Sequence, residues 1–165
     1  MDVYLRKTIP FFTMCQVVII PVLRKPAWFR FYDLRVSTSL PSPAEGHHSM
    51  KLDLNRLLLP HPDASYLVRV MGDSMTGGES GIRDGALLAV DCLLEPRPDD
   101  VVIAAIEGEF TVKRLVKRRS GAWFLVPDNP SFPEMAIDTP DMFDVWGVVT
   151  HVVTETRRGR LSNHL

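Results

Sequence analysis

The sequence predicts a mainly β protein: a mostly antiparallel domain over about residues 52–156, with one short helix and a flexible N-terminal arm. Three observations favour this class. From residue 66 onward, short runs rich in Val, Ile and Leu are separated by turns that contain Gly, Asp or Ser. The 13 prolines indicate several chain reversals and at least one extended segment. The length of 165 residues favours one domain with room for an arm.

The composition is that of a globular protein in a reducing compartment. Hydrophobic residues make up 45% of the chain and charged residues 24%, which excludes wholesale disorder. A net charge of −1 argues against a protein that coats nucleic acid through bulk charge. Cys15 and Cys92 are far apart and lack metal-ligand spacing, so they predict neither a disulfide scaffold nor a zinc site. We therefore expect a cytoplasmic protein.

The N-terminal part of the chain differs from the rest and indicates an arm followed by a linker. Residues 1–36 hold six Lys or Arg against two acids and show no helical period. The apolar stretch 11–23 is much shorter than the roughly 20 residues of a membrane helix, and no signal-peptide cleavage site follows it. Alternatively, Met14 is the true start of the chain. We assign residues 1–38 to the arm and 39–51 to an extended linker rich in Ser and Pro.

One helix and six strands are expected in the β domain. Asp53 can cap a helix over 54–59, which Pro60 would stop. The strands are expected at 66–71, 86–90, 101–106, 109–117, 122–126 and 143–154. The last of these is long and apolar, so it is either an edge that pairs with a second copy or a central strand of the monomer. Residues 157–165 form a polar tail.

A candidate nucleophile lies in Gly72-Asp73-Ser74-Met75, just past the first of these strands. A glycine before a serine at the end of a strand lets the backbone bend sharply, which exposes the hydroxyl. The bend also leaves backbone N–H groups pointing outward, so that Ser74 could attack a carbonyl with oxyanion donors nearby. Alone the pattern is weak, because most Gly-x-Ser sequences are ordinary turns.

Lys113 is a candidate general base in the middle of the apolar strand 109–117. A lysine in a strand usually points to solvent, and that is the simpler interpretation. If Lys113 faces inward instead, desolvation disfavours its charged form and lowers its pKa, and the neutral amine can then act as a base. A neutral amine beside the Ser74 hydroxyl would make a Ser/Lys dyad, a variant of the catalytic triad.

Other catalytic sets fit the sequence less well. A Ser-His-Asp triad would require a histidine near Ser74, and only His151 lies in a core strand, where a histidine is more often a packing residue. The glycines at 77, 78 and 81 match neither a phosphate loop nor a dinucleotide fingerprint. The basic run 117–119 is expected to be a solvated hairpin tip.

Six short motifs carry a family resemblance. They are Leu40-Pro-Ser-Pro-Ala44, Leu52-Asp-Leu-Asn55, Gly72-Asp-Ser-Met75, Val102-Ile-Ala-Ala105, Glu107-Gly-Glu-Phe-Thr-Val-Lys113 and Gly147-Val-Val-Thr-His-Val-Val153. In this order and spacing they resemble UmuD, which belongs with LexA and phage repressors among the self-cleaving Ser/Lys peptidases. The resemblance covers roughly residues 39–155, and the motifs are specific only in combination.

The resemblance implies a LexA-type peptidase fold, a small, coiled, mostly β structure. Ser74 matches the nucleophile and Lys113 the general base, with backbone N–H groups of Asp73 and Ser74 forming the oxyanion hole. The substrate would be the protein's own arm, cut after contact with the RecA–single-stranded DNA filament of the SOS response. The processed form would then be a homodimer that joins a UmuC-type Y-family DNA polymerase for error-prone bypass of lesions. The resemblance implies no cofactor, metal, membrane or sequence-specific DNA contact.

Two features depart from the family pattern. The family's scissile bond usually joins a small residue to glycine, whereas the matching bond here is Thr38–Ser39. Thr is β-branched and Ser lacks the backbone freedom of glycine, so cleavage could be slow, shifted or absent. In addition, the loop after Ser74 is longer than usual.

Rival functions remain beside self-cleavage. A LexA-type repressor requires a helix-turn-helix module, for which residues 1–37 are too short and carry three prolines. A type I signal peptidase also uses a Ser/Lys pair, but it requires a membrane anchor and other motifs around its lysine. The alternative that stays open is a polymerase accessory protein that keeps the fold and has lost cleavage.

Overall fold

The computed structural model describes residues 19–20, 28–32, 49–106, 108–137 and 143–156. The predicted scissile bond Thr38–Ser39, most of the predicted arm and linker, and the tail 157–165 lie outside these residues. The predicted β domain is described almost completely, so the fold that surrounds the candidate site can be followed strand by strand.

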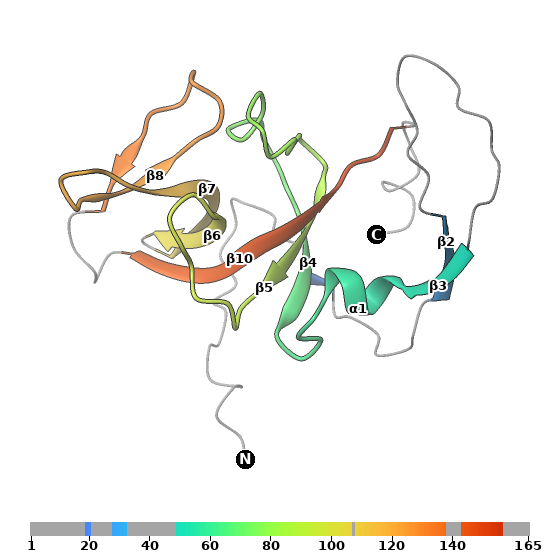
Figure 1. Ribbon diagram of the computed structural model, residues 1–165. Coiled ribbons are helices and arrows are strands. Elements are labelled where there is room, and N and C mark those ends of the chain that lie inside the picture. Colours follow the sequence, from blue (N-terminus) through green and yellow to red (C-terminus); the bar gives the residue numbers. More distant parts are fainter. Residues whose placement is uncertain (1–18, 21–27, 33–48, 107, 138–142, 157–165) are drawn as a thin grey trace.

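The predicted fold class is confirmed: the described residues form two antiparallel sheets and one short helix (Figure 1). The small sheet pairs β2 (Trp28–Tyr32) with β3 (Ser49–Asp53). The large sheet has eight strands, and its neighbouring strands are antiparallel. Their spatial order is β1 (Ile19–Ile20), β4 (Ser65–Arg69), β5 (Leu87–Asp91), β10 (Phe143–Val153), β6 (Val101–Ile106), β7 (Glu109–Lys117), β8 (Trp123–Val126) and β9 (Met135–Ala136).

The predicted elements agree with the observed ones to within two residues at each end. β6 and β7 have the predicted bounds. Helix α1 spans Leu54–Leu58 and is one residue shorter than predicted, because Leu59 has left the helical conformation and acts as the C-cap. Asp53 caps the other end, as predicted, and its Oδ1 accepts a hydrogen bond from Asn55 N–H at 3.1 Å.

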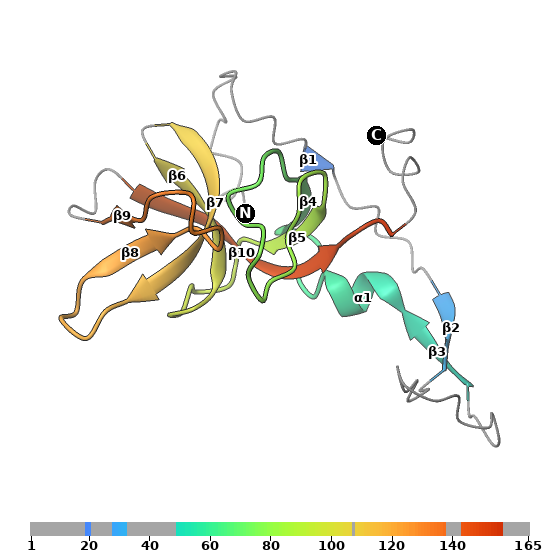
Figure 2. The ribbon, with the colours of Figure 1, turned by 90° about the horizontal axis from the view of Figure 1, so that it is seen from above.

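Of the two alternatives left open for β10, the central strand of the monomer is correct and the free edge is wrong. Its first half pairs with β6 and its second half with β5, so it joins the two halves of the large sheet (Figures 1 and 2). The register shifts between Val145 and Gly147 and again between Val149 and His151. Such irregularities bend a strand and increase its twist. One long strand can therefore serve two differently oriented groups of strands.

Both faces of β6 are buried, which places hydrophobic clusters on either side of the sheet. Val101 and Ile103 belong to one cluster, together with residues of β4, β5 and the loop after β4. Val102 and Ala104 belong to a second cluster, together with residues of β7, β8 and β10. Successive side chains of a strand point to opposite faces. The continuous apolar run in this strand is thus explained by burial on both sides.

Parts of the predicted arm and linker pair with other strands. β1 adds to the outer edge of β4, with Ile19 opposite Val68, and β2 pairs along the whole of β3. β3 begins at Ser49, so residues 49–51 of the predicted linker form a strand. These strands are short and lack a regular apolar alternation, which is why the sequence does not reveal them.

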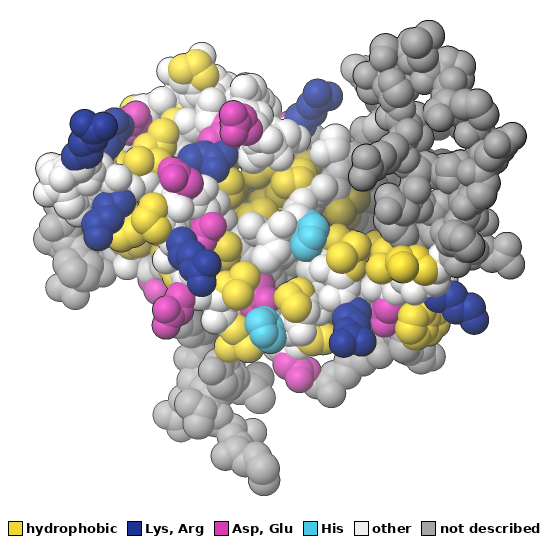
Figure 3. Space-filling view, viewed as in Figure 1, with side chains coloured by type: hydrophobic (Ala, Val, Ile, Leu, Met, Phe, Trp, Pro, Cys, Tyr) yellow, Lys and Arg dark blue, Asp and Glu magenta, His cyan; other side chains and the backbone are white. Residues whose placement is uncertain are grey.

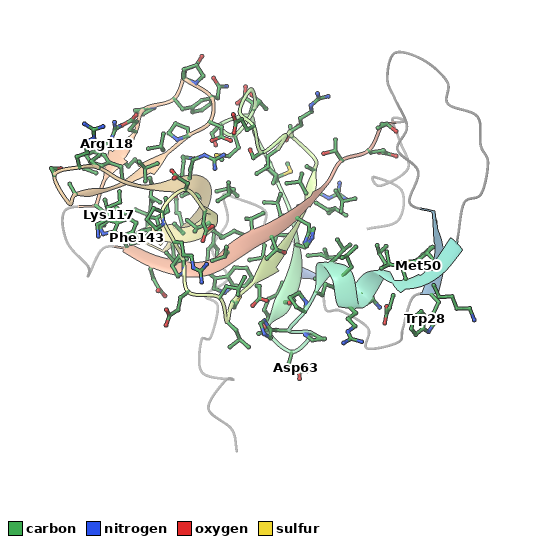
Figure 4. All side chains as sticks on the ribbon, viewed as in Figure 1. Trp28, Met50, Asp63, Lys117, Arg118 and Phe143 are labelled. Atoms are coloured by element: carbon green, nitrogen blue, oxygen red, sulfur yellow. The ribbon has the colours of Figure 1, made fainter. Side chains whose placement is uncertain are left out.

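The small sheet carries exposed hydrophobic side chains. Trp28 is 62% exposed and Met50 61% exposed, and Figure 3 shows hydrophobic side chains gathered over α1, β2 and β3. Figure 4 places Trp28 and Met50 at the opposite end of the molecule from Lys117 and Arg118 at the β7–β8 hairpin. Neither hydrophobic cluster contains a described residue of the small sheet, so this sheet lies apart from the core.

Gly147→Ala should destabilise the fold, because β10 passes close over β5 at this point. A Cβ on residue 147 would lie 2.7 Å from Val90 Cγ1 and 3.2 Å from the backbone oxygen of Asp91. We expect a loss of about 1–3 kcal/mol in the free energy of unfolding, measured in urea. The control Val153→Thr, at the exposed end of the same strand, should change it by less than about 0.5 kcal/mol. Equal losses in the two variants would contradict the close crossing.

Candidate active site

Ser74 lies in the loop 71–85, called the Ser74 loop below, which connects β4 to β5. Gly72, two residues earlier, has a φ of +94°, a conformation that other residues rarely adopt. Its N–H donates to Asp84 Oδ1 at 2.8 Å. The bend predicted before the serine is therefore present, and a carboxylate from the far end of the loop holds it. Ser74 itself is partly exposed, as a nucleophile has to be.

Buried side chains anchor the Ser74 loop in the core. Met75, directly after the serine, and Ile82 are almost fully buried and belong to the cluster that includes β4, β5 and β6. Val70 N–H donates to Ala86 O, which joins the two ends of the loop. A loop that is closed at its base and anchored by two core side chains restricts where the Ser74 hydroxyl can lie.

Lys113 is buried, with only 8% of its surface exposed. It lies in the middle of β7, opposite the fully buried Val102 of β6. The simpler interpretation of the sequence, a lysine that points to solvent, is therefore wrong. Burial of an amine disfavours its charged form, because the ammonium loses its hydration.

Ser74 and Lys113 are in direct contact. Lys113 Nζ donates to Ser74 Oγ at 3.0 Å, to Thr111 Oγ1 at 2.9 Å and to Val112 O at 3.0 Å. A neutral amine has two N–H donors and one lone pair. It can therefore donate to Thr111 and Val112 while its lone pair accepts the proton of the Ser74 hydroxyl. These distances lie within the range in which a base can take a proton from a nucleophile.

The contact between Ser74 and Lys113 joins parts of the large sheet that are far apart in its strand order. In spatial order, β4, which leads into the Ser74 loop, is separated from β7 by β5, β10 and β6. A flat sheet with strands about 4.8 Å apart would hold β4 and β7 roughly 19 Å from each other. The hydrogen bond therefore requires the sheet to coil and the Ser74 loop to reach across it.

The backbone around Ser74 is held by Asn129, to which the sequence assigned no role. Asp73 O accepts hydrogen bonds from Thr76 N–H at 3.0 Å, Thr76 Oγ1 at 2.8 Å and Asn129 Nδ2 at 3.1 Å. Asn129 N–H donates to Ser74 O at 3.0 Å. Within the described part of the chain, no main-chain carbonyl accepts from the N–H of Asp73 or Ser74, the two predicted oxyanion donors.

Asp128, the residue before Asn129, links the Ser74 loop to β7. Its carboxylate accepts from Arg114 Nε and Nη2, both at 2.9 Å, and from Ser80 Oγ at 2.5 Å. The hydrogen bond that Arg114 donates to Asp128 holds the pKa of its guanidinium above the ordinary value. Gly78 leaves room for this carboxylate, since a Cβ there would lie 2.3 Å from Asp128 Oδ2. In the sequence, an Asp-Asn pair before proline indicates only a turn.

The histidines considered from the sequence lie elsewhere. His151 Nδ1 is 3.1 Å from Thr150 Oγ1 in β10, and no contact joins it to Ser74 among the described residues. His61 contacts the buried Asp91 at 2.6 Å, at the opposite end of β5 from the Ser74 loop. The other three histidines fall outside the described ranges. Within those ranges, no three His, Cys, Asp or Glu side chains are grouped as metal ligands would be.

Comparison with known proteins shows the family. The family described as Peptidase S24-like matches residues 30–150. The chain belongs to this family. Protein MucA of Salmonella typhimurium is 43% identical over 127 residues, which cover 76% of this chain and 84% of MucA. Protein ImpA of Shigella flexneri is 40% identical over 126 residues, which cover 76% of this chain and 83% of ImpA.

Similarity also extends to a repressor. The LexA repressor of Paracidovorax citrulli is 36% identical over 123 residues, which cover 74% of this S24-like chain but 53% of the repressor. The prediction of a UmuD-like member of the LexA and UmuD family is confirmed, and so is the enzyme class, a peptidase. In the part of the chain that the structure describes, no helix has the length and apolar character of a membrane span.

Arg114→Lys should destabilise this S24-like chain, because an ammonium cannot reproduce the two-point contact of the guanidinium with Asp128. The Asp128 side chain is only 6% exposed, so water replaces these bonds poorly. We expect a loss of about 1.5–3 kcal/mol in the free energy of unfolding, measured in urea. The matched control is Arg118→Lys, whose pair with Glu134 is exposed and should contribute less than about 1 kcal/mol. Similar losses in both variants would contradict this role of Arg114.

Proposed function

We propose that this chain is a self-cleaving serine peptidase whose substrate is its own N-terminal arm, cut at Thr38–Ser39. The observation that carries the proposal is the 3.0 Å contact between the buried amine of Lys113 and Ser74 Oγ. A nucleophile and a base within hydrogen-bond reach are the signature of covalent catalysis. Membership in a peptidase family supports the same class of reaction.

The reaction would proceed through an ester on Ser74. Ser74 Oγ attacks the carbonyl carbon of Thr38, and its proton passes to the neutral amine of Lys113. The C–N bond to Ser39 then breaks, and the Lys113 ammonium gives the proton to the leaving amine. Water, deprotonated by Lys113, hydrolyses the ester and restores the hydroxyl. The N–H groups of Asp73 and Ser74 would stabilise the oxyanion that forms in both steps.

We further propose that the RecA–single-stranded DNA filament stimulates cleavage in the cytoplasm. The processed form would be a homodimer that joins a UmuC-type polymerase in error-prone lesion bypass. The motif resemblance over residues 39–155 and the 40–43% identity to ImpA and MucA support this role. Because β10 is central in the monomer, such a dimer would use a surface other than an edge of β10.

A second candidate function is a polymerase accessory protein that keeps the fold without cleaving itself. The observation that favours it is the predicted scissile bond, in which Thr38 is β-branched and Ser39 replaces the usual glycine. Serine has less backbone freedom than glycine and a β-branched side chain is stiff, so Thr38 and Ser39 can adopt fewer of the conformations that entry into an active site can require. The two candidates share the site and differ only in whether the bond is cut.

Substitution of either dyad residue should stop cleavage in a folded protein. Ser74→Ala removes the nucleophile and should abolish the product. Lys113→Ala should slow cleavage at least about a hundredfold, the usual contribution of a general base. Lys113→Arg should be equally slow, because a guanidinium stays charged. Intact-mass analysis after incubation with activated RecA measures the product, expected to begin at Ser39. A product that begins beyond Leu52, or wild-type rates in Lys113→Ala, would contradict the proposal.

Cleavage without RecA should accelerate as the pH rises and then level off. Only a neutral amine accepts the proton of Ser74, so the rate follows the deprotonated fraction of Lys113 and becomes constant once deprotonation is complete. The measurement is a set of incubations between pH 6 and 10, followed on a gel with Ser74→Ala as the blank. A rate that is independent of pH across this range would contradict a lysine base.

The scissile bond can be tested separately from the dyad. If wild type is not cut, the double change Thr38→Ala with Ser39→Gly should restore cleavage, because it removes the β-branch and supplies glycine's backbone freedom. The same double change in a Ser74→Ala chain is the matched control and should stay intact. A folded double variant that is not cut at any pH, with or without RecA, would favour the accessory protein.

A further inference from the structure

Asn129 contacts both carbonyl groups that flank the α-carbon of the nucleophile. Its side-chain Nδ2 donates to Asp73 O at 3.1 Å and to Thr76 Oγ1 at 3.3 Å, and its backbone N–H donates to Ser74 O at 3.0 Å. Its Oδ1 accepts from Ser131 N–H at 3.0 Å, which fixes the side of the amide that carries the oxygen. Asn129 thus holds the turn at Ser74 through its side-chain Nδ2 and its backbone N–H, while its Oδ1 is held by Ser131.

We propose that Asn129 is a positioning residue that orients the N–H of Ser74, one of the two oxyanion donors proposed above. The proposal rests on the peptidase function proposed above. In a trans peptide the C=O and the following N–H lie in one plane and point in opposite directions, and the described residues contain no cis peptide. Fixing Asp73 O therefore aims the N–H of Ser74 the other way. The bond to Ser74 O holds the following peptide as well, so the backbone is fixed on both sides of the Ser74 α-carbon.

Asp73 O is held from more than one side. Besides Asn129 Nδ2, it accepts from the backbone N–H and the hydroxyl of Thr76, while Asn129 Nδ2 also donates to that hydroxyl. These bonds close a small ring, so the plane of the Asp73–Ser74 peptide cannot rotate without breaking several of them. Oxyanion stabilisation requires donors that are already aimed before charge develops, because reorientation during the reaction would raise the barrier.

Asn129 is held in turn by the strand that carries the base. The preceding residue, Asp128, is bound at two points by Arg114 of β7, which directly follows Lys113. The same strand, β7, therefore carries the amine of the base and supports Asn129, which holds the carbonyl groups around the nucleophile. Loss of the Asn129 side chain should disturb the donors at Ser74 while leaving the contacts of Lys113 with Thr111 and Val112 in place.

The test variant is Asn129→Asp in the full chain, which keeps the shape and the oxygen that accepts from Ser131 but removes the Nδ2 donors. The matched control is Ser131→Ala. It keeps the backbone N–H that donates a hydrogen bond to Asn129 Oδ1, and it removes only an exposed hydroxyl. Removal of one oxyanion donor slows hydrolases about a hundredfold to a thousandfold, so misalignment should lower the rate by about tenfold or more. The control should cleave at the wild-type rate.

The pH profile separates positioning of donors from an effect on the base. In Asn129→Asp the plateau rate at high pH should fall about tenfold or more, while the pH at half-maximal rate stays within about 0.3 units of wild type. A wild-type plateau would overturn the proposal. So would a shifted midpoint with an unchanged plateau, because that result would mean that Asn129 acts through Lys113.

A second measurement does not depend on cleavage. Amide hydrogen exchange of the peptide 71–77 is compared between Ser74→Ala chains with and without Asn129→Asp, with Ser131→Ala added as the control. This peptide is identical in all three, so its intrinsic exchange rates are the same. Asn129→Asp should speed its exchange by about tenfold or more, and unchanged exchange would overturn the proposal. Faster exchange in a chain whose wild type never cleaves would support the anchoring by Asn129 and overturn the peptidase function instead.

Discussion

The hydrogen bond between Lys113 and Ser74 is the interaction on which the candidate site depends, and it is available only because the large sheet is coiled. The two residues come from opposite sides of a group of three strands. The irregularities of β10 and the close crossing at Gly147 let one strand run through both halves of that sheet. The fold thus supplies both the proximity of the two groups and the burial that disfavours a charged amine.

Much of the fold follows from local patterns in the sequence. The run Val101–Ile106, the Gly108 turn and the alternation in Glu109–Lys117 determine a hairpin from neighbouring residues alone, and its strands have the predicted bounds. Asp53 likewise caps the helix through a contact with Asn55, only two residues along the chain. The place of β10 in the sheet could not be predicted in this way. An apolar strand has the same sequence pattern at the edge of a sheet and in its centre. Only the tertiary pairing distinguishes the two positions.

The residues of the candidate site likewise fall into those that the local sequence indicates and those that only the folded structure reveals. Ser74 is marked by a local bend at Gly72, and Lys113 by the unusual position of a charge in an apolar strand, so both could be selected from the sequence. Whether Lys113 faces inward depends on residues 39 positions away. Asp128 and Asn129 carry no signal beyond that of a turn, because the groups they hold are brought to them by the coiling of the sheet.

The pairing of β2 with β3 changes what hydrolysis of the Thr38–Ser39 bond would accomplish. That bond lies between the two strands in the sequence, so its loss would convert one hairpin into two separate chains held by strand pairing. The association of β2 with β3 would then pass from an intramolecular to a bimolecular equilibrium and would lose the effective concentration that the connecting segment provides. Release of the arm would become a dissociation step, distinct from bond cleavage and favoured by dilution.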